Sequence, residues 1–259
     1  MLIITAPSKT QNQIKRLFPF STEPRFLARS EILIDRLQSF SLPNLCSLMK
    51  TSVNLGTSTR QRILDFRPPL TLSNSRQAIF TFQGDAYESL TPETYTEEQL
   101  HHAQNHFRIL SGLYGILRPL DLMFPYRLEM GCKLAGKGYE NLYQFWGDAI
   151  TDAINADCAD HQDQTVVNLA SDEYFRVINA KRLVPRLVTV TFQQKKNDDY
   201  RTVPIHSKRA RGMMIHFMIT NHITQAEHLK QFNQGNYRLC EEMSTTDRWF
   251  FRQDDATSL

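Results

Sequence analysis

The stretch from Leu110 to Gly131, LSGLYGILRPLDLMFPYRLEMG, restricts how the middle of this chain can fold. Residues that break helices and strands recur in it at short intervals: Gly112, Gly115, Pro119, Pro125 and Gly131. No element longer than about two helical turns fits between such residues. The stretch is therefore predicted to be a structured turn region.

Polar side chains fill this turn region: Tyr114, Arg118, Asp121, Tyr126, Arg127 and Glu129. A plain connector has no need of these long charged and aromatic groups, because Ser or Asn would serve as well. Loops carry function as often as they simply connect elements. Two interpretations therefore stay open. Either the segment lines a binding site, or its Arg and Asp residues satisfy the backbone groups of tight turns.

The composition excludes two broad classes of protein. Of the 259 residues, 41% are hydrophobic and 10% aromatic, so the chain can bury a substantial core and is not disordered. Lys and Arg number 30 against 27 Asp and Glu, which gives a formal net charge of +3. The protein is therefore not coated in basic residues, and any binding of nucleic acid has to come from a local basic cluster. We find no repeat or linker and expect one domain over residues 1–259.

Cysteine usage and hydropathy indicate a cytoplasmic protein. The four cysteines lie far apart without a C-x-x-C pair, so we expect reduced thiols and no zinc or redox site: Cys46, Cys132, Cys158 and Cys240. The apolar run from Leu2 to Ala6 is too short for a signal peptide. The window from Met213 to Ile219 is far short of the roughly 20 residues of a membrane span. We expect no cofactor, no metal and no membrane partner.

Three predicted strands each deliver polar side chains at their carboxyl ends. The strands are Leu2–Thr5, Gln77–Phe82 and Thr165–Ala170. The polar residues that follow them include Ser8 and Lys9, then Asp85 and Tyr87, then Ser171, Asp172, Glu173 and Tyr174. Ligand-binding residues favour the carboxyl ends of strands. The pattern therefore predicts that these groups meet in one polar cleft.

Each of these groups also has a simpler interpretation. Lys9 is either a ligand for phosphate or carboxylate or a solvated charge, and the Gly-rich loop of a true P-loop is absent. Asp85 is either the cap of the following helix or a general base. Ser171 or Asp172 is expected to cap the helix that follows, which leaves Glu173 and Tyr174 unexplained.

Amphipathic patterns predict one helix each over Arg25–Phe40, Thr96–Leu110 and Asn141–Cys158, and one or two helices over Leu42–Leu64. Thr96 and Gln99 have the spacing of a capping box at the start of the helix predicted over Thr96–Leu110. His102 and His106 share one face of that helix at a spacing used by metal ligands. No third ligand lies nearby in the sequence, so a pair of packing histidines is the favoured interpretation.

The last third of the chain predicts hairpins and one basic helix. Arg186–Gln194 pairs with Tyr200–His206, and Tyr237–Met243 with Asp247–Arg252. Three cations, Lys208, Arg209 and Arg211, open the intervening helix. Cations at a helix N-terminus oppose its dipole, which indicates an anionic partner unless this is a solvated basic turn. The expected fold is α+β, with a mixed sheet flanked by helices.

Leu110–Gly131 resembles the signature of the YaaA family, the peroxide-stress resistance proteins. Further blocks that match the family in order are APSKT at Ala6–Thr10, FQGDAY at Phe82–Tyr87, LYQFWGD at Leu142–Asp148, NLASDEYF at Asn168–Phe175 and KRARG at Lys208–Gly212. They run from the N-terminus to the last fifth of the chain. The resemblance implies protection against hydrogen peroxide by limiting free iron, and binding of duplex DNA through a helix-hairpin-helix motif. Here the helix Thr96–Leu110 and the following LSGLYG match such a motif in part, because Gly112 and Gly115 are three apart rather than two.

Two hypotheses for function follow. In the first, double-stranded DNA is bound in a cleft through cations that contact phosphates: Arg118, Arg127, Lys208, Arg209 and Arg211. In the second, the same cleft is the site of an enzyme that acts on a small anionic, nucleotide-like substrate. Lys9 then supplies an amine, Asp85 or Glu173 a base, and Tyr87 a proton relay. Direct sequestration of iron has the least support, because no dense constellation of metal ligands occurs. The sequence leaves the oligomeric state open.

Overall fold

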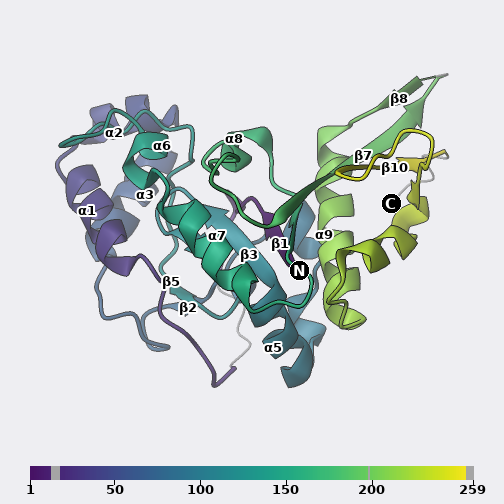
Figure 1. Ribbon diagram of the computed structural model, residues 1–259. Helices are drawn as coiled ribbons and strands as arrows, with labels where there is room; N and C mark the ends of the chain where they lie inside the picture. The colour runs from purple at the N-terminus through teal and green to yellow at the C-terminus, as the bar shows by residue number, and fades with distance from the viewer. Residues whose placement is uncertain (13–17, 198, 255–259) are drawn as a thin grey trace.

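The computed structural model describes residues 1–12, 18–197 and 199–254, and a mixed eight-stranded sheet runs through them (Figure 1). Its strand order is β4-β3-β1-β6-β7-β10-β9, with β8 paired to β7. The pairs β1–β3, β1–β6, β6–β7 and β7–β10 are parallel, and the pairs that β4, β8 and β9 make are antiparallel. The predicted α+β class with a mixed sheet is confirmed.

The centre of the sheet is formed by short strands whose residues are all buried. They are β1 (Leu2–Thr5), β3 (Phe107–Ser111) and β6 (Thr165–Asn168). Parallel strands covered on both faces have continuous apolar sequences, as the runs LIIT and TVVN show. Because β1 and β6 are adjacent and parallel, their carboxyl ends lie at the same edge of the sheet. The residues that follow these two strands are therefore brought together.

The strands of the last third form the far side of the sheet. β7 (Arg186–Lys196) pairs with β8 (Asp199–Arg201), and β9 (Arg238–Leu239) pairs with β10 (Arg248–Gln253). Both predicted hairpins are thus present. The strand predicted over Tyr200–His206 ends at Arg201, because Pro204 begins helix α9 (Pro204–Thr220).

Helices surround the sheet, and the amphipathic patterns place most of them correctly. α1 (Leu27–Gln38), α2 (Leu42–Met49) and α3 (Val53–Asp65) gather at one end of the molecule, whereas α9 lies across from them beyond the parallel strands (Figure 1). The remaining longer helices are α5 (Glu97–His106) and α7 (Ala149–Ala159). Within the described residues, no helix is both long and apolar enough to cross a membrane.

The strand predicted over Gln77–Phe82 is wrong. β2 covers only Arg76–Gln77, paired with β5 (Leu122–Met123), and a 3-10 turn over Ala78–Phe80 follows it. The Thr81 hydroxyl donates a hydrogen bond to the Gln77 carbonyl across this turn at 2.9 Å. The apolar run is buried as expected, but burial alone does not distinguish a strand from a compact turn.

The helix-hairpin-helix predicted from Thr96 onward is also wrong. α5 ends at His106, and the chain continues as β3, a tight turn, and β4 (Gly115–Leu117) antiparallel to β3. The run FRILS is drawn into the sheet beside β1, where it is fully buried. The glycines therefore form a β-hairpin.

The helix predicted over Asn141–Cys158 is divided at Gly147. It forms α6 (Leu142–Trp146) and α7, because Gly147 has a φ of +52° that an α-helix does not tolerate.

The capping box predicted at the start of α5 is confirmed. The Gln99 amide donates to Thr96 Oγ1 at 3.2 Å, and the Thr96 amide donates to Gln99 Oε1 at 3.0 Å. We expect Thr96→Ala to lower the free energy of unfolding by about 1 kcal/mol. Gln99→Glu, which preserves a capping box, should change it little. Urea denaturation at an unchanged m value measures both, and equal losses in the two variants would contradict the assignment.

Candidate functional site

A cleft of about 430 Å³ opens at the carboxyl ends of β1 and β6. The turn after β1 forms one wall, and the others come from α4 (Asp85–Glu88), α8 (Asp172–Phe175) and the second and third turns of α9. Its lining includes Lys9, Asp85, Tyr87, Glu173, Tyr174, Lys208 and Arg211. The structure therefore brings together all four candidate catalytic residues and two of the five predicted anion-binding residues.

Two glycines allow the walls of the cleft to meet. A Cβ atom on Gly212 would lie 1.9 Å from the Ala86 carbonyl oxygen, so only glycine lets α9 pack this closely on α4. Gly84 has a φ of +94°, and a Cβ there would lie 3.2 Å from Ser8 Oγ. The short helix α4 is thus held between the turn after β1 and α9, which puts Asp85 and Arg211 in the lining of one cleft.

Arg211 is the cation of the cleft that lacks an ion-pair partner among the described residues. Its Nε is buried and has no hydrogen-bond partner, and none of the residues that the structure describes forms an ion pair with it. Burial lowers the pKa of Arg211, and among the described residues the carboxylate of Asp172 acts against this. A guanidinium stays charged in proteins, and a buried charge without a partner is costly. The site is therefore suited to an anion.

The other cations near the cleft are paired with carboxylates or exposed. Lys9 Nζ lies 3.2 Å from Glu129 Oε1, and Arg127 Nη2 lies 3.3 Å from the same oxygen in an adjoining hollow. Arg209 Nε lies 3.9 Å from Asp85 Oδ1. Lys208 is exposed at the mouth. Glu129 thus neutralises both Lys9, the candidate amine, and Arg127, a predicted phosphate contact.

Tyr87 and Glu173 are both tied to the backbone. The Tyr87 hydroxyl donates to the Ala6 carbonyl at 2.9 Å, and burial raises the pKa of Tyr87 well above its usual value. Glu173 Oε1 accepts a hydrogen bond from the Gly131 amide at 2.9 Å, which joins α8 to the turn region. Both groups therefore hold the walls of the cleft together, and Tyr87 keeps its proton at neutral pH.

The capping roles expected of Asp85, Ser171 and Asp172 are not present. Asp85 is the first residue of α4, and Gly84 occupies the N-cap position. Ser171 is at the N-cap of α8, but its side chain makes no cap hydrogen bond, and Asp172 lies inside that helix. Asp85 is thus free of the role that competed with its interpretation as a base.

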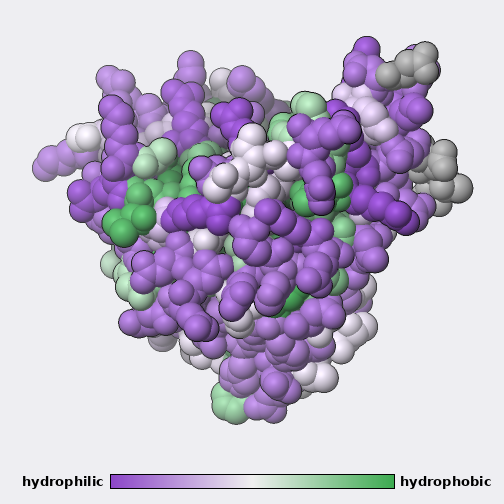
Figure 2. All heavy atoms as spheres, turned by 45° about the vertical axis from the view of Figure 1, so that its right-hand side comes forward, coloured by the Kyte–Doolittle hydropathy of each residue, from purple (hydrophilic) through white to green (hydrophobic). Residues whose placement is uncertain are grey.

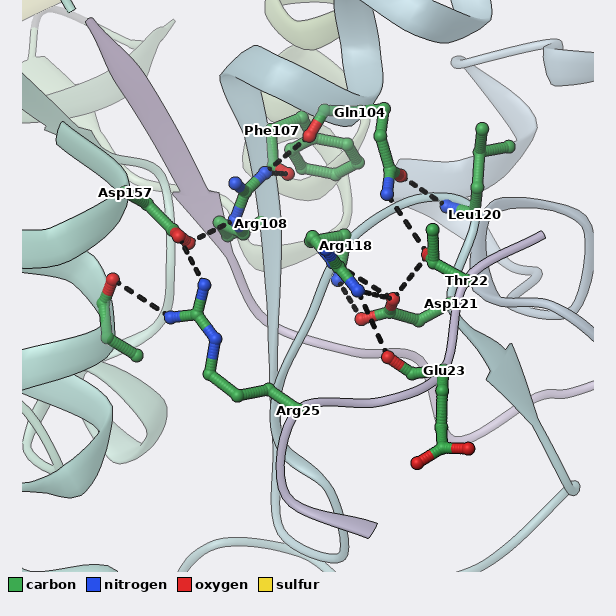
Figure 3. A network of polar contacts seen from close by, with 11 residues as sticks. Thr22, Glu23, Arg25, Gln104, Phe107, Arg108, Arg118, Leu120, Asp121 and Asp157 are labelled. Carbon is green, nitrogen blue, oxygen red and sulfur yellow. Dashed lines mark hydrogen bonds and ion pairs between the residues drawn. The ribbon is translucent and has the colours of Figure 1, made fainter. Parts of the chain in front are cut away.

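Arg118 does not line the cleft, which corrects the prediction. Its backbone amide and Nε donate to Asp121 at 2.8 and 3.0 Å, and Nη2 donates to the Glu23 carbonyl at 3.0 Å (Figure 3). Asp121 is buried, so it requires a cation beside it. Arg118 therefore satisfies a turn, as the simpler interpretation of this segment anticipated.

The three basic residues of α9 do not open the helix, because α9 begins at Pro204. Lys208 is thus the fifth helical residue, beyond the first turn to which the helix dipole is effectively confined. The argument from the dipole is therefore wrong. The site's need for an anion rests instead on the burial of Arg211.

A second hollow lies beside the cleft, and no sequence motif predicts it. It has a volume of about 450 Å³ and is lined by Lys50, Cys132 and Lys133 together with Glu129 and Glu173. Lys50 ends α2 and Lys133 follows the turn region, so no motif connects them. Among the described residues, no three His, Cys, Asp or Glu side chains are arranged to hold a metal ion.

Comparisons with known proteins agree with the resemblance seen in the sequence. Residues 1–243 match the family model described as peroxide stress protein YaaA. The chain is 45% identical over 251 residues to a UPF0246 protein of Acaryochloris marina, covering 97% of this chain and 99% of the relative. It is 41% identical over 257 residues to UPF0246 proteins of Neisseria meningitidis and Cupriavidus metallidurans. Each of these alignments covers 98% of this chain, with 99% and 98% of the respective relative.

Proposed function

The chain belongs to the peroxide stress protein YaaA family, and from this premise we propose that it acts in peroxide protection by binding a small phosphate-bearing, nucleotide-like ligand in the cleft. The observation that carries the proposal is the unpaired, partly buried guanidinium of Arg211. Arginine binds phosphate through strong, often bidentate hydrogen bonds. A phosphate in the cleft would supply the negative charge that the described residues around Arg211 do not.

The shape and charge of the cleft favour a small molecule. Its volume of about 430 Å³ lies within the roughly 300–1,000 Å³ usual for small-ligand sites. Its walls include the buried rings of Tyr87 and Tyr174, which offer apolar surface to a base or sugar. Carboxylates also line the cleft, and the negatively charged backbone of DNA would gain no favourable contact from them.

The same residues support an enzymatic role for the site. The Lys9 amine and the Asp85 carboxylate line the cavity that contains Arg211. A ligand anchored by its phosphate at Arg211 would expose its remaining atoms to an amine and a carboxylate. These are groups that serve in nucleophilic and general acid-base catalysis. Incubation with each bound nucleotide, followed by product analysis, tests for turnover.

We expect Arg211→Met to weaken binding of a phosphate-bearing nucleotide at least about tenfold, since a charge-assisted contact is lost. Titration calorimetry with adenosine mono-, di- and triphosphates measures this. Arg238→Met, at an exposed arginine of β9, is the matched control and should bind like the wild type. Arg211→Met should also raise the stability of the ligand-free protein, because a partly buried charge without an ion-pair partner among the described residues is removed. Unchanged nucleotide affinity, or a loss of stability, would contradict the proposal.

Duplex DNA is a second candidate ligand, favoured by exposed cations on α9. Lys208 is exposed and Arg209 is one-third exposed beside it. The face of the molecule drawn in Figure 2 is mostly hydrophilic. Fluorescence anisotropy with a labelled duplex, from roughly 50 to 200 mM salt, distinguishes the two ligands. A DNA site requires steep salt dependence that the double variant Lys208→Ala, Arg209→Ala loses. If both proteins bind equally weakly, the DNA candidate fails and the nucleotide proposal is untouched.

Peroxide protection itself needs a test in cells. A strain without the protein, complemented with wild type or Arg211→Met, is challenged with hydrogen peroxide while its free iron is measured. We expect only the wild type to restore survival and low free iron. Full rescue by Arg211→Met would separate peroxide protection from the ligand of the cleft.

A further inference from the structure

Four histidine rings form a row at the end of β1 opposite the cleft. Their order is His222, His102, His106 and His161, and successive ring centroids are 5.1, 4.5 and 4.7 Å apart. Two come from α5, one follows the end of α9, and one follows α7. His106 Nδ1 lies 2.9 Å from the carbonyl oxygen of Met1, just before β1. The row therefore joins segments that are distant in the sequence.

Burial and missing hydrogen bonds disfavour charged rings in this row, although His106 is bonded to the Met1 carbonyl. His102 Nε2 and His161 Nδ1 are buried without a hydrogen-bond partner in the described part of the chain. Burial, together with the neighbouring His106 and His222, lowers the pKa of His102 to about 4, against a backbone hydrogen bond with Ile223 that raises it. Burial likewise lowers the pKa of His161 to about 4 and that of His106 below its usual value. At neutral pH these three rings are therefore uncharged.

The groups around the row do not offset added positive charge. The Arg108 guanidinium is itself positive, and the Met1 amino group, whose pKa burial lowers, supplies no negative charge either. Burial raises the pKa of the Cys158 thiol to about 11, so it stays neutral.

Two of the carboxylates on this side already have partners. Asp157 pairs with Arg108 and Arg25, and Asp163 accepts from the Ala226 amide and the Thr165 hydroxyl. A hollow of about 390 Å³, lined by His106, His161, Asp157 and the exposed Asp160, gives solvent access to one end of the row. Protons can thus reach rings that form no ion pair with a carboxylate of the described residues, and the already paired Asp157 offsets the lowered pKa of His161 only in part.

We propose that this histidine row is an acid-sensitive latch, in which uncharged rings hold α5 against the end of α9 and the start of β1, and protonation drives these segments apart. Each ring with a lowered pKa binds protons more weakly in the latched state than in the opened one. Latching is therefore complete above pH 6.5 and is lost as the pH falls toward about 4. For one histidine, the opening constant rises roughly 20-fold between about pH 7 and about pH 5.

Hydrogen exchange, corrected for the intrinsic effect of pH, tests the latch in the full chain. Between about pH 7 and about pH 5 we expect protection over residues 97–106 and 213–223 to fall at least roughly 20-fold. Protection over β7 and β10 should be kept. The double variant His102→Phe, His161→Phe keeps aromatic rings without their charge, so its protection should depend less on pH than that of the wild type, with only the contribution of His106 left. His101→Phe is the control, because His101 is half-exposed outside the row and should leave the wild-type response intact.

Three outcomes overturn the proposal. The first is that protection in the wild type does not fall at pH 5. The second is that protection over β7 and β10 falls as much as over residues 97–106 and 213–223. The third is that His101→Phe loses the pH dependence of protection as the double variant does. If the double variant does not fold, imidazole titration by NMR in the wild type decides. Midpoints for His102 and His161 near that of an exposed histidine would refute the latch.

Discussion

Gly212→Ala is expected to leave the protein largely unfolded or to lower its stability by more than about 4 kcal/mol. Alanine normally stabilises the interior of a helix relative to glycine by about 1 kcal/mol, so the expected sign is the reverse of the usual one. The reason is that the new Cβ would lie 1.9 Å from the Ala86 carbonyl oxygen and 2.8 Å from its carbon. Both are backbone atoms, which cannot rotate away as a side chain can. Helix α9 would have to leave α4.

Gly138→Ala is the matched control for this substitution. Gly138 has a φ of +85°, but a Cβ there meets no atom within 4 Å. The control therefore reports backbone strain without a clash and should lower stability by about 1 kcal/mol. Urea denaturation compares the two variants. Equal losses would show that α9 and α4 can separate at little cost, and the cleft would then not be rigidly built.

If part of the Gly212→Ala protein still folds, its nucleotide binding gives a second readout. Since α9 supplies Lys208 and Arg211, its displacement should abolish nucleotide binding before it abolishes the sheet. Arg211→Met, by contrast, should lose binding while gaining stability. The two variants thus separate a defect in the walls of the cleft from a defect in its chemistry.

The sequence predicted the parts of the site that depend on local patterns. The strands at Leu2–Thr5 and Thr165–Asn168 are short apolar runs followed by polar residues, and their adjacency puts both sets of polar groups in one cleft. The capping box at Thr96 depends only on residues three apart. These features are encoded within a few residues, so they can be read without knowing the fold.

The predictions that failed depend on contacts between distant residues. No local pattern near Phe107 indicates that the chain leaves the helix there and pairs with β1. None near Gly212 indicates that the backbone of Ala86 packs against it. Arg118 looks like a ligand-binding residue until its partners Asp121 and Glu23 are known. The burial of Arg211, on which the proposed function rests, likewise follows from how α4 and α9 pack.

Arg108→Met should be the second most damaging substitution, because it breaks a buried network (Figure 3). Arg108 is only 5% exposed, and its Nε donates to Asp157 Oδ2 at 2.7 Å. Its Nη1 donates to the carbonyls of Gln104 and Phe107, both at 2.7 Å. Removal of one partner of a buried ion pair costs about 3–5 kcal/mol, since the other charge stays buried. Arg25 still contacts Asp157, so the lower end of this range is expected.

A double-mutant cycle in urea isolates the ion pair from the packing. Because Arg108→Met already leaves Asp157 without its buried partner, adding Asp157→Asn should restore part of the lost stability, and the two effects should not add. Arg201→Met breaks an ion pair with Asp199 in which both side chains are about two-thirds exposed, so it should change stability little. Additive losses in the cycle would show that the Arg108 hydrogen bonds to Gln104 and Phe107, rather than its charge, hold α5 and β3 together. In that case the Arg108 charge, which lies next to the histidine row, could be removed without releasing α7, the helix that carries Asp157.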